Sequence, residues 1–379
     1  MTPTVHSPHS GWLLYHSVGK FPGQEEAMHT ALDAFTSAWC RADSGRWDAG
    51  LAARRNVLDQ WATLIRAPAQ TVFSAENVTE AFARFVGALG RDRLAGKRVL
   101  IAADCFPSLH YLLSGLAAVL GFTLDTVEFD EDANYVSDDA YLARWQDDVA
   151  LAVITWVTST TSRRANLSRL IAHGRAQGSL IAVDVTQGVG LLEFDVAQYP
   201  VDFAAATTLK WLCGVPGTAL AYIHLALLDD ALQPLVQGWF SQPDPFNWNL
   251  AHFTLASDAR RFDSGTPSLL PFVASGPGLA WRLSTSFDVT RAHNLTLSHR
   301  LIALCDAKGY PLRSPRDDRQ RGGSVMVELP AHINPRTLEV ALERDGVLVD
   351  TRDTTLRLSP GVLTDPSVLD VLSSVLPQG

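Results

Sequence analysis

The sequence predicts an α/β protein with a mostly parallel sheet that is covered by helices on both faces. Through the middle of the chain, short apolar and β-branched runs alternate with longer segments of helical periodicity. From about residue 279 the pattern becomes mainly helical with short strands, which indicates a smaller α+β domain. We therefore expect a large domain at residues 51–275 and a small one at residues 276–379. Residues 1–50 are expected to pack with the small domain.

The large domain is expected to contain six strands that directly precede or follow helical segments. In parallel sheets ligands bind at the carboxyl ends of the strands, so polar residues just beyond a strand are candidate site residues. Helices are predicted at residues 107–120 and 167–177, and another begins near Asn77. The strands are predicted at residues 98–103, 123–129, 151–156, 180–184, 201–206 and 218–223.

The rest of the chain departs from this rhythm. Residues 237–253 are rich in Pro, Trp and Phe and are expected to form a long ordered loop. A helix is predicted at residues 289–306, and short strands at residues 324–329 and 356–359. These elements make up the small domain.

Composition excludes several classes of function. A net charge of −9 argues against nucleic acid or an anionic membrane as the main partner. The four cysteines are widely spread, without a Cys-x-x-Cys pair or a Cys/His cluster, so we expect free thiols and no metal site. The sequence starts without a signal-peptide pattern, and no apolar run reaches about 18 residues. We therefore expect a cytoplasmic protein.

Lys210 is the strongest candidate for a catalytic residue. It is one of only four lysines, whereas 27 of the 31 basic residues are arginines, so a general need for positive charge does not explain it. Asp184 ends a predicted strand 26 residues earlier. A pyridoxal 5'-phosphate site requires such a pair, because the lysine forms a Schiff base and a buried aspartate keeps the pyridine nitrogen protonated.

Two features near strand ends could hold the other parts of such a cofactor. The predicted helix start at Asn77, Val78 and Thr79 offers backbone N–H groups and a hydroxyl to a phosphate. An ordinary helix cap explains the same residues. Phe106, directly after a predicted strand, is placed to stack on a planar ring, and core packing is the alternative.

Further candidates lie beyond other strands and in the late part of the chain. Ser159, Gln187 and Thr207 are candidate cofactor contacts, and for Ser159 and Gln187 a polar turn residue is the alternative explanation. Thr266, in a Gly-Thr-Pro turn, offers a hydroxyl to a phosphate. Arg357, on a predicted strand of the small domain, could bind a substrate carboxylate through two hydrogen bonds, and a surface salt bridge is the alternative.

These motifs resemble the class V aminotransferase group of fold-type I pyridoxal phosphate enzymes. The segment Asp184-Val-Thr-Gln187 is similar to the group's Asp-x-x-Gln turn. Lys210-Trp-Leu-x-Gly-x-Pro-Gly is similar to its Schiff-base segment, and Thr79-Glu-Ala81 to its phosphate-binding helix start. The resemblance implies a fold-type I architecture and pyridoxal 5'-phosphate as cofactor.

Within this group the chain is most similar to kynureninases. The resemblance implies that Trp239 contacts the cofactor, and that Ser17, Phe240 and Arg357 contact an amino-acid substrate. It also implies that Thr266 reaches the phosphate of a partner subunit, hence a homodimer with shared sites. The segments that carry this similarity are Leu14–Gly19, Phe106-Pro-Ser108, Gly238-Trp-Phe240, Gly265-Thr-Pro267 and Asp345–Arg357.

The chain also departs from the kynureninase pattern at four positions. Leu209 stands where a Tyr precedes the Schiff-base lysine, and Leu109 replaces an Asp. A pocket His has no counterpart near residues 44–47, and none follows Phe240. Because the other motifs are kept, the sequence still predicts a kynureninase-like hydrolase that cleaves a Cβ–Cγ bond.

Other activities remain open. They are an aminotransferase, a β-eliminating lyase, an epimerase or, less favoured, a catalytically degenerate binding protein. A cysteine desulfurase is disfavoured, because no Cys lies in the stretch before Arg357. A nucleotide enzyme would need a Gly-x-Gly-x-x-Gly motif, which the sequence lacks.

Overall fold

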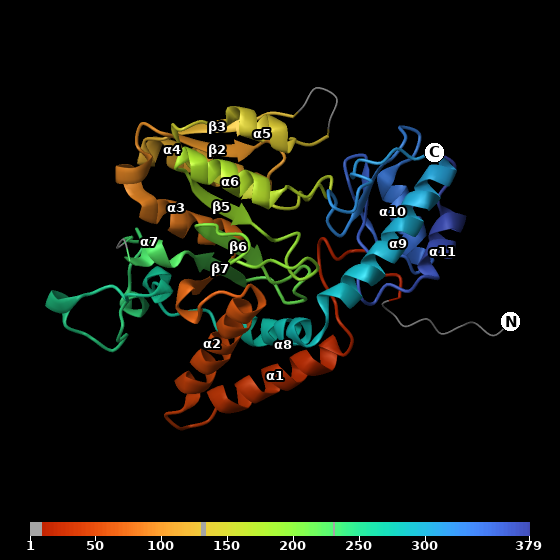
Figure 1. Ribbon diagram of the computed structural model, residues 1–379. Coiled ribbons are helices and arrows are strands. Elements are labelled where there is room, and N and C mark those ends of the chain that lie inside the picture. Colours follow the sequence, from red (N-terminus) through yellow and green to blue (C-terminus); the bar gives the residue numbers. More distant parts are fainter. Residues whose placement is uncertain (1–9, 130–133, 230–231) are drawn as a thin grey trace.

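A seven-stranded sheet forms the centre of the molecule in the computed structural model, which describes residues 10–129, 134–229 and 232–379 (Figure 1). The strand order is β1-β7-β6-β5-β4-β2-β3. The five strands from β6 to β3 are mutually parallel, whereas β7 runs antiparallel to both β6 and β1. The predicted mostly parallel sheet is confirmed. The strands are β1 (Val72–Ala75), β2 (Arg98–Ala102), β3 (Thr123–Val127), β4 (Val149–Thr155), β5 (Leu180–Asp184), β6 (Phe203–Thr207) and β7 (Ala219–Ile223).

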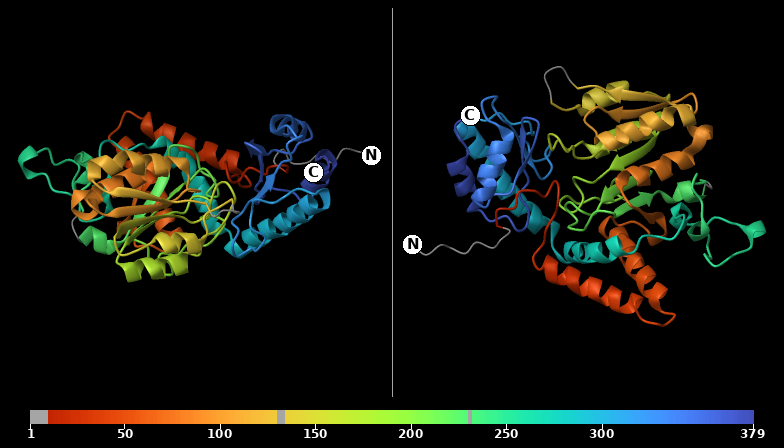
Figure 2. Two further views of the ribbon diagram at one scale, coloured as in Figure 1. Left: turned by 90° about the horizontal axis from the view of Figure 1, so that it is seen from above. Right: turned by 180° about the vertical axis from the view of Figure 1, so that it is seen from behind.

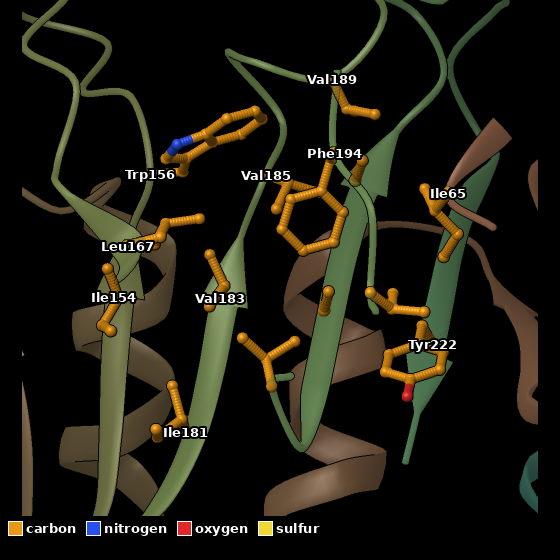
Figure 3. Close-up of a cluster of buried hydrophobic side chains, with 14 of the residues drawn as sticks. Ile65, Ile154, Trp156, Leu167, Ile181, Val183, Val185, Val189, Phe194 and Tyr222 are labelled. Carbon is orange, nitrogen blue, oxygen red and sulfur yellow. The ribbon is translucent and has the colours of Figure 1, made fainter. Parts of the chain in front are cut away.

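Helices cover both faces of this sheet because its strands are apolar on both sides. On β5, Ile181 and Val183 face one core, whereas Ala182 between them faces the other. The first core is closed by α2, α6 and α8, and Figure 3 shows part of it, with Leu167 of α6 near Ile154. The second is closed by α3, α4 and α7. These helices are α2 (Arg46–Leu64), α3 (Val78–Leu94), α4 (Pro107–Leu120), α6 (Leu167–Gln177), α7 (Leu225–Asp229) and α8 (Leu270–Ser284).

The helices and strands predicted for the large domain are found with small shifts of their ends. Further elements had not been predicted, among them β1, α2, α5 (Asp138–Arg144) and α7. Four residues are too few to show a period, so β1 is identified only by its pairing with β7. The predicted loop at residues 237–253 is confirmed and contains two 3₁₀ turns, η2 (Trp239–Ser241) and η3 (Leu250–His252).

The small domain lies beside the sheet and is joined to it by the long helix α9 (Figures 1 and 2). Its three strands pair antiparallel in the order β8-β10-β9, which sets Arg357 opposite Asp350. Helices and strands share one apolar core that includes Leu301, Val327 and Leu342. The elements are α9 (Phe287–Lys308), β8 (Val325–Glu328), α10 (Pro335–Arg344), β9 (Asp350–Arg352), β10 (Thr355–Leu358) and α11 (Val368–Val375).

The N-terminal segment divides between the two domains. Leu13 exchanges backbone hydrogen bonds with Leu348 and Ser359 of the small domain, at 3.0 and 2.8 Å. Helix α1 (Gln24–Trp39) instead packs on α2 and α8. Helix α8 in turn crosses the boundary predicted at residue 276 and packs with the large domain.

The domain boundaries therefore remain a proposal, and residues 1–9 of the predicted N-terminal segment lie outside the described residues. Within the described ranges no helix is long and apolar enough to cross a membrane.

Candidate active site

A cavity of about 530 Å³ opens at the carboxyl ends of β4, β5 and β6. Their parallel pairing brings residues that are far apart in the sequence to one edge of the sheet. Nine of the predicted site residues line this cavity: Asn77, Val78, Thr79, Phe106, Ser159, Asp184, Gln187, Thr207 and Lys210.

Asp184 is the last residue of β5, so its carboxylate lies at the inner edge of the cavity. The side chain is buried, and its Oδ1 accepts a hydrogen bond from the Thr186 N–H at 3.0 Å. Burial raises the pKa of Asp184, although the Thr186 hydrogen bonds and the charge of Lys210 oppose this shift. The described residues place no ion-pair partner within 4 Å of this carboxylate. A bound cation would therefore be strongly favoured beside it.

Lys210 lies in the loop that turns the chain from β6 into β7. The turn is closed by backbone hydrogen bonds from Thr208 N to Thr218 O (3.1 Å) and from Gly214 N to Thr208 O (2.8 Å). Burial lowers the pKa of Lys210 to about 8; Asp184 acts against this shift, whereas Arg357 and Arg352 add to it. A substantial fraction of the amine is therefore neutral and nucleophilic near pH 8.

The N-terminal segment is laid directly against this loop. Gly19 N–H donates to Leu209 O at 2.9 Å, and a Cβ at Gly19 would lie 1.7 Å from Lys210 O. Only glycine allows the backbones to approach so closely. Nearby, the Gln187 amide donates to His16 O at 3.0 Å. The N-terminal segment thus contacts the backbone that carries Lys210.

The start of α3 also lines the cavity. Asn77 caps this helix, because its Oδ1 accepts the Glu80 N–H at 2.9 Å. The cap explanation is therefore correct. It does not exclude anion binding, since the N–H groups of Val78 and Thr79 have no helical carbonyl to donate to and both residues line the cavity.

Phe106 covers the amine of Lys210 and does not pack in the core. Its side chain is 40% exposed, and Lys210 Nζ lies 5.5 Å from the centre of its ring. The alternative of core packing is thereby removed. An aromatic ring above a lysine amine leaves room for a flat molecule to stack beneath it.

Two buried hydroxyl groups of the cavity have no hydrogen-bond partner among the described residues. They are Thr155 Oγ1 and Ser159 Oγ. An unsatisfied buried polar group costs about 1–3 kcal/mol, so their presence together indicates that a polar ligand completes the site. Pyridoxal 5'-phosphate fits, since its ring substituents are polar, its ring nitrogen is basic and its phosphate is an anion.

Six residues that line the cavity were not predicted as site residues. Thr155 and Thr186 carried the same signal as Ser159 and Gln187, because they also end or follow a strand. Leu109 and Leu209 had been noted only as departures from a motif. The six are Ser108, Leu109, Thr155, Val157, Thr186 and Leu209.

Five predicted site residues lie outside the cavity. Arg357 is buried and donates through Nε to Asp350 Oδ1 at 2.8 Å, so it forms a buried ion pair and not the surface salt bridge considered above. Ser17 is half-buried in the N-terminal segment. Trp239 and Phe240 pack on each other with ring centres 4.6 Å apart, and Thr266 is exposed. Figure 1 shows that the loop beyond η2 projects away from the small domain.

The described residues contain no group of three or more His, Cys, Asp or Glu that could hold a metal ion. A buried lysine and aspartate at the carboxyl edge of a parallel sheet, with a helix start for an anion, instead define a pyridoxal phosphate enzyme site.

Comparison with known proteins gives the family. The chain belongs to the class V aminotransferase family, whose profile matches residues 36–357. A kynureninase of Deinococcus radiodurans is 31% identical over 63% of this chain and 57% of its own length. One of Geobacillus thermodenitrificans is 27% identical over 70% and 64%, so the chain matches less than two thirds of either relative. An uncharacterized aminotransferase of Bacillus subtilis, YcbU, is 23% identical over 83% and 80%.

Solved structures agree on the fold. A cysteine desulfurase of Thermococcus onnurineus has a TM-score of 0.83 at 18% identity, with 96% of this chain and 92% of that one covered. The cystine C–S lyase C-DES has a TM-score of 0.84 at 17% identity, with 96% of both chains covered. The fold-type I architecture is therefore confirmed, and the cofactor of this enzyme is pyridoxal 5'-phosphate.

Proposed function

We propose that this enzyme acts on an amino acid through Lys210 and hydrolyses a Cβ–Cγ bond, as a kynureninase does. The observation that carries the proposal is the single cavity in which Lys210, Asp184 and the start of α3 meet. Kynureninases among the relatives and the kynureninase-like motifs support this reaction.

The residues of the cavity have separate tasks. When bound, the cofactor supplies an aldehyde carbon that takes up an amine and a ring that withdraws electrons from the substrate Cα. Lys210 would hold that aldehyde carbon in the resting enzyme, and its lowered pKa of about 8 suits it to accept a proton from Cα. Asp184 would balance positive charge at the ring nitrogen, Phe106 would cover the ring, and the N–H groups at Val78 and Thr79 would bind the phosphate.

Proton transfer in this cavity falls to Lys210. Among the residues that line it, Lys210 and Asp184 are the titratable ones, and Asp184 is committed to the ring nitrogen. Leu209, which replaces the family's Tyr, has no proton to exchange. Arg357 would hold the substrate carboxylate through a bidentate contact.

A product assay with a panel of amino acids tests the reaction. The holoenzyme is incubated with kynurenine, 3-hydroxykynurenine, aspartate, alanine and cysteine while the cofactor absorbance is recorded. Release of anthranilate from kynurenine is the expected result. Pyruvate from any member of the panel, without anthranilate, would contradict hydrolytic cleavage.

A β-eliminating lyase is the second candidate, and Leu209 is the observation that favours it. Elimination needs proton removal at Cα, which Lys210 supplies, but no further proton donor at the position of Leu209. The variant Leu209→Tyr separates the two reactions, with Leu209→Phe as a control of similar size. A hydrolase should release anthranilate faster in the Tyr variant alone, whereas a lyase should lose pyruvate formation in both.

A catalytically degenerate binding protein is the remaining alternative. It predicts that no amino acid of the panel changes the cofactor absorbance. The joint presence of Asp184, Gln187, Lys210 and Arg357 in and beside one cavity supports an active enzyme instead.

A homodimer belongs to the same proposal. Thr266 is exposed and, with Trp239 and Phe240, lies outside this chain's own cavity, and the family resemblance assigns the Thr266 turn to a partner's phosphate. Light scattering should give the mass of two chains. Cysteines without disulfides are consistent with the proposed cytoplasmic location.

A further inference from the structure

A continuous chain of side-chain hydrogen bonds lies behind Arg357. Arg357 Nε and Nη2 donate to the two carboxylate oxygens of Asp350 on the neighbouring strand β9. Asp350 Oδ1 is also 2.9 Å from His16 Nε2, and His16 Nδ1 is 2.7 Å from Ser359 Oγ. A residue of the N-terminal segment is thus built into the small domain at the point where Arg357 is held.

The His16 ring is neutral at physiological pH and its tautomer follows from its partners. Burial lowers the pKa of His16 to about 4, although the hydrogen bond with Asp350 opposes this shift. A carboxylate can only accept, so the proton is on Nε2 and the lone pair of Nδ1 faces the Ser359 hydroxyl. Burial alone would raise the pKa of Asp350, but His16 and Arg357 lower it. Asp350 is therefore ionised, and hydrogen bonds with both His16 and Arg357 hold its carboxylate in place.

Asp350 occupies only one edge of the Arg357 guanidinium. The bonded edge is formed by Nε and Nη2. The other edge is formed by Nη1 and Nη2, and Nη1 has no partner in the part of the chain that the structure describes. A planar guanidinium offers five N–H groups and can bind one carboxylate on each edge. Arg357 can thus keep Asp350 and still bind a second carboxylate.

The chain of hydrogen bonds lies against the cavity. His16 O accepts from Gln187 Nε2, and Gln187 lines the cavity. Three residues further on, Gly19 is bonded to Leu209 O, next to the lysine. The positive charge of Arg357 contributes to the lowered pKa of Lys210, so the two charges interact across the site.

We propose that His16 is a positioning residue for substrate recognition. Through Asp350 it fixes the plane of Arg357, so that the open guanidinium edge faces the carboxylate of an amino-acid substrate. His16 itself touches neither substrate nor cofactor. The inference rests on the proposed function, because it requires a carboxylate-bearing substrate at Lys210.

Paired ligands that differ only in the carboxylate test this role. The holoenzyme is titrated with kynurenine and with kynuramine, its decarboxylated amine, and with alanine and ethylamine, and binding is read from the cofactor absorbance. His16→Ala should weaken binding of the amino acids about 10- to 100-fold and leave binding of the amines unchanged. His16→Gln, whose amide nitrogen can take the place of Nε2 and donate to Asp350, should recover part of the affinity.

Equal loss for amino acid and amine, or no loss for either, would overturn the proposal. His173→Ala is the matched control, because His173 is also hydrogen-bonded, to Trp145 O at 2.8 Å, but lies on α6 and is only partly buried. It should not change either affinity. A wild-type enzyme that responds to no amino acid would instead overturn the proposed function, and this inference with it.

A double-mutant cycle shows whether His16 acts through Arg357. In an Arg357→Gln background, His16→Ala should cause no further loss of amino-acid affinity. A full additional loss in that background would overturn the proposal. If His16→Ala fails to fold or to keep the cofactor, Asp350→Asn interrupts the same chain with little change in volume, and it should show the same selective loss for amino acids.

Discussion

The two sides of the site differ in how their polar groups are satisfied. On the sheet side, Thr155 and Ser159 have buried hydroxyls without partners, and Asp184 has no ion pair, among the described residues. On the small-domain side, Asp350 is bonded to both Arg357 and His16. Unsatisfied buried groups cost stability. The sheet side is therefore built around a ligand, whereas the small-domain side is built to hold one side chain in place.

Removal of Lys210 should have the largest effect on the sheet side. Lys210→Ala takes away both the attachment point of the cofactor and the base, so turnover of the best panel substrate should fall by roughly 10²- to 10⁴-fold or more. Lys97→Ala, at an exposed lysine outside the cavity, is the control and should keep full turnover. Comparable turnover of the Lys210 variant and the wild type would contradict this role.

Asp184→Asn should have two opposite effects. It should raise the stability of the cofactor-free protein and weaken the binding of the cofactor. Because burial raises the folded-state pKa of Asp184, its stabilising effect is present at acid pH and is lost as the pH rises through that pKa. At neutral pH the charge therefore destabilises the empty protein, and the Asn variant should melt roughly 1–3 °C higher.

The same variant should bind pyridoxal phosphate more weakly by roughly 2–5 kcal/mol, since it cannot pair with the charged ring nitrogen. Calorimetry measures the melting temperature of the empty variant, and titration with pyridoxal phosphate measures its affinity for the cofactor. A loss of stability in the empty Asn variant would show that Asp184 is already satisfied without a ligand.

The attachment of the cofactor should depend on pH with a midpoint near 8. The neutral amine is the nucleophile, so the rate should rise about tenfold per pH unit below the lowered pKa of Lys210 and level off above it. Stopped-flow absorbance measures this rate.

Arg352→Gln removes one repelling charge and should move the midpoint upward, whereas a midpoint near the ordinary value of 10.5 in the wild type would contradict the burial of Lys210. The same linkage acts on stability. Between pH 8 and 10.5 the unfolded chain binds a proton that folded Lys210 does not, so this contribution rises with pH.

The smallest expected effects are those of alanine substitutions at two buried serines, Ser159 and Ser179. Ser159→Ala removes a hydroxyl that only a ligand can satisfy, so it should weaken cofactor binding by about 0.5–1.5 kcal/mol without loss of stability in the empty protein. Ser179 Oγ instead accepts the Trp145 indole N–H at 2.8 Å. Ser179→Ala should cost about 1–3 kcal/mol of unfolding free energy and leave cofactor binding unchanged. The same response in both variants would remove the distinction between the two kinds of polar group.

The sheet side of the site could be predicted from the sequence because strand ends are local signals. Lys210 and Asp184 each follow an apolar run, and parallel pairing brings such ends together. The antiparallel pairing of β1 could not be predicted, since four residues carry no period and only the contact with β7 defines the strand.

The small-domain side depends on contacts between distant parts of the chain. His16 and Asp350 are 334 positions apart, and no local pattern links them. Arg357 could be predicted as a binding residue, but the Asp350 carboxylate that holds it follows from the register of β9 and β10. Side-chain networks that join the N-terminal segment to the last strands require the folded structure.

The most direct test of the central claim is to locate the cofactor on the chain. The protein is loaded with pyridoxal 5'-phosphate, reduced with borohydride, digested and analysed by mass spectrometry. We predict that the label is on Lys210 and not on Lys20, Lys97 or Lys308. An unlabelled Lys210, or a label spread evenly over the four lysines, would contradict the account.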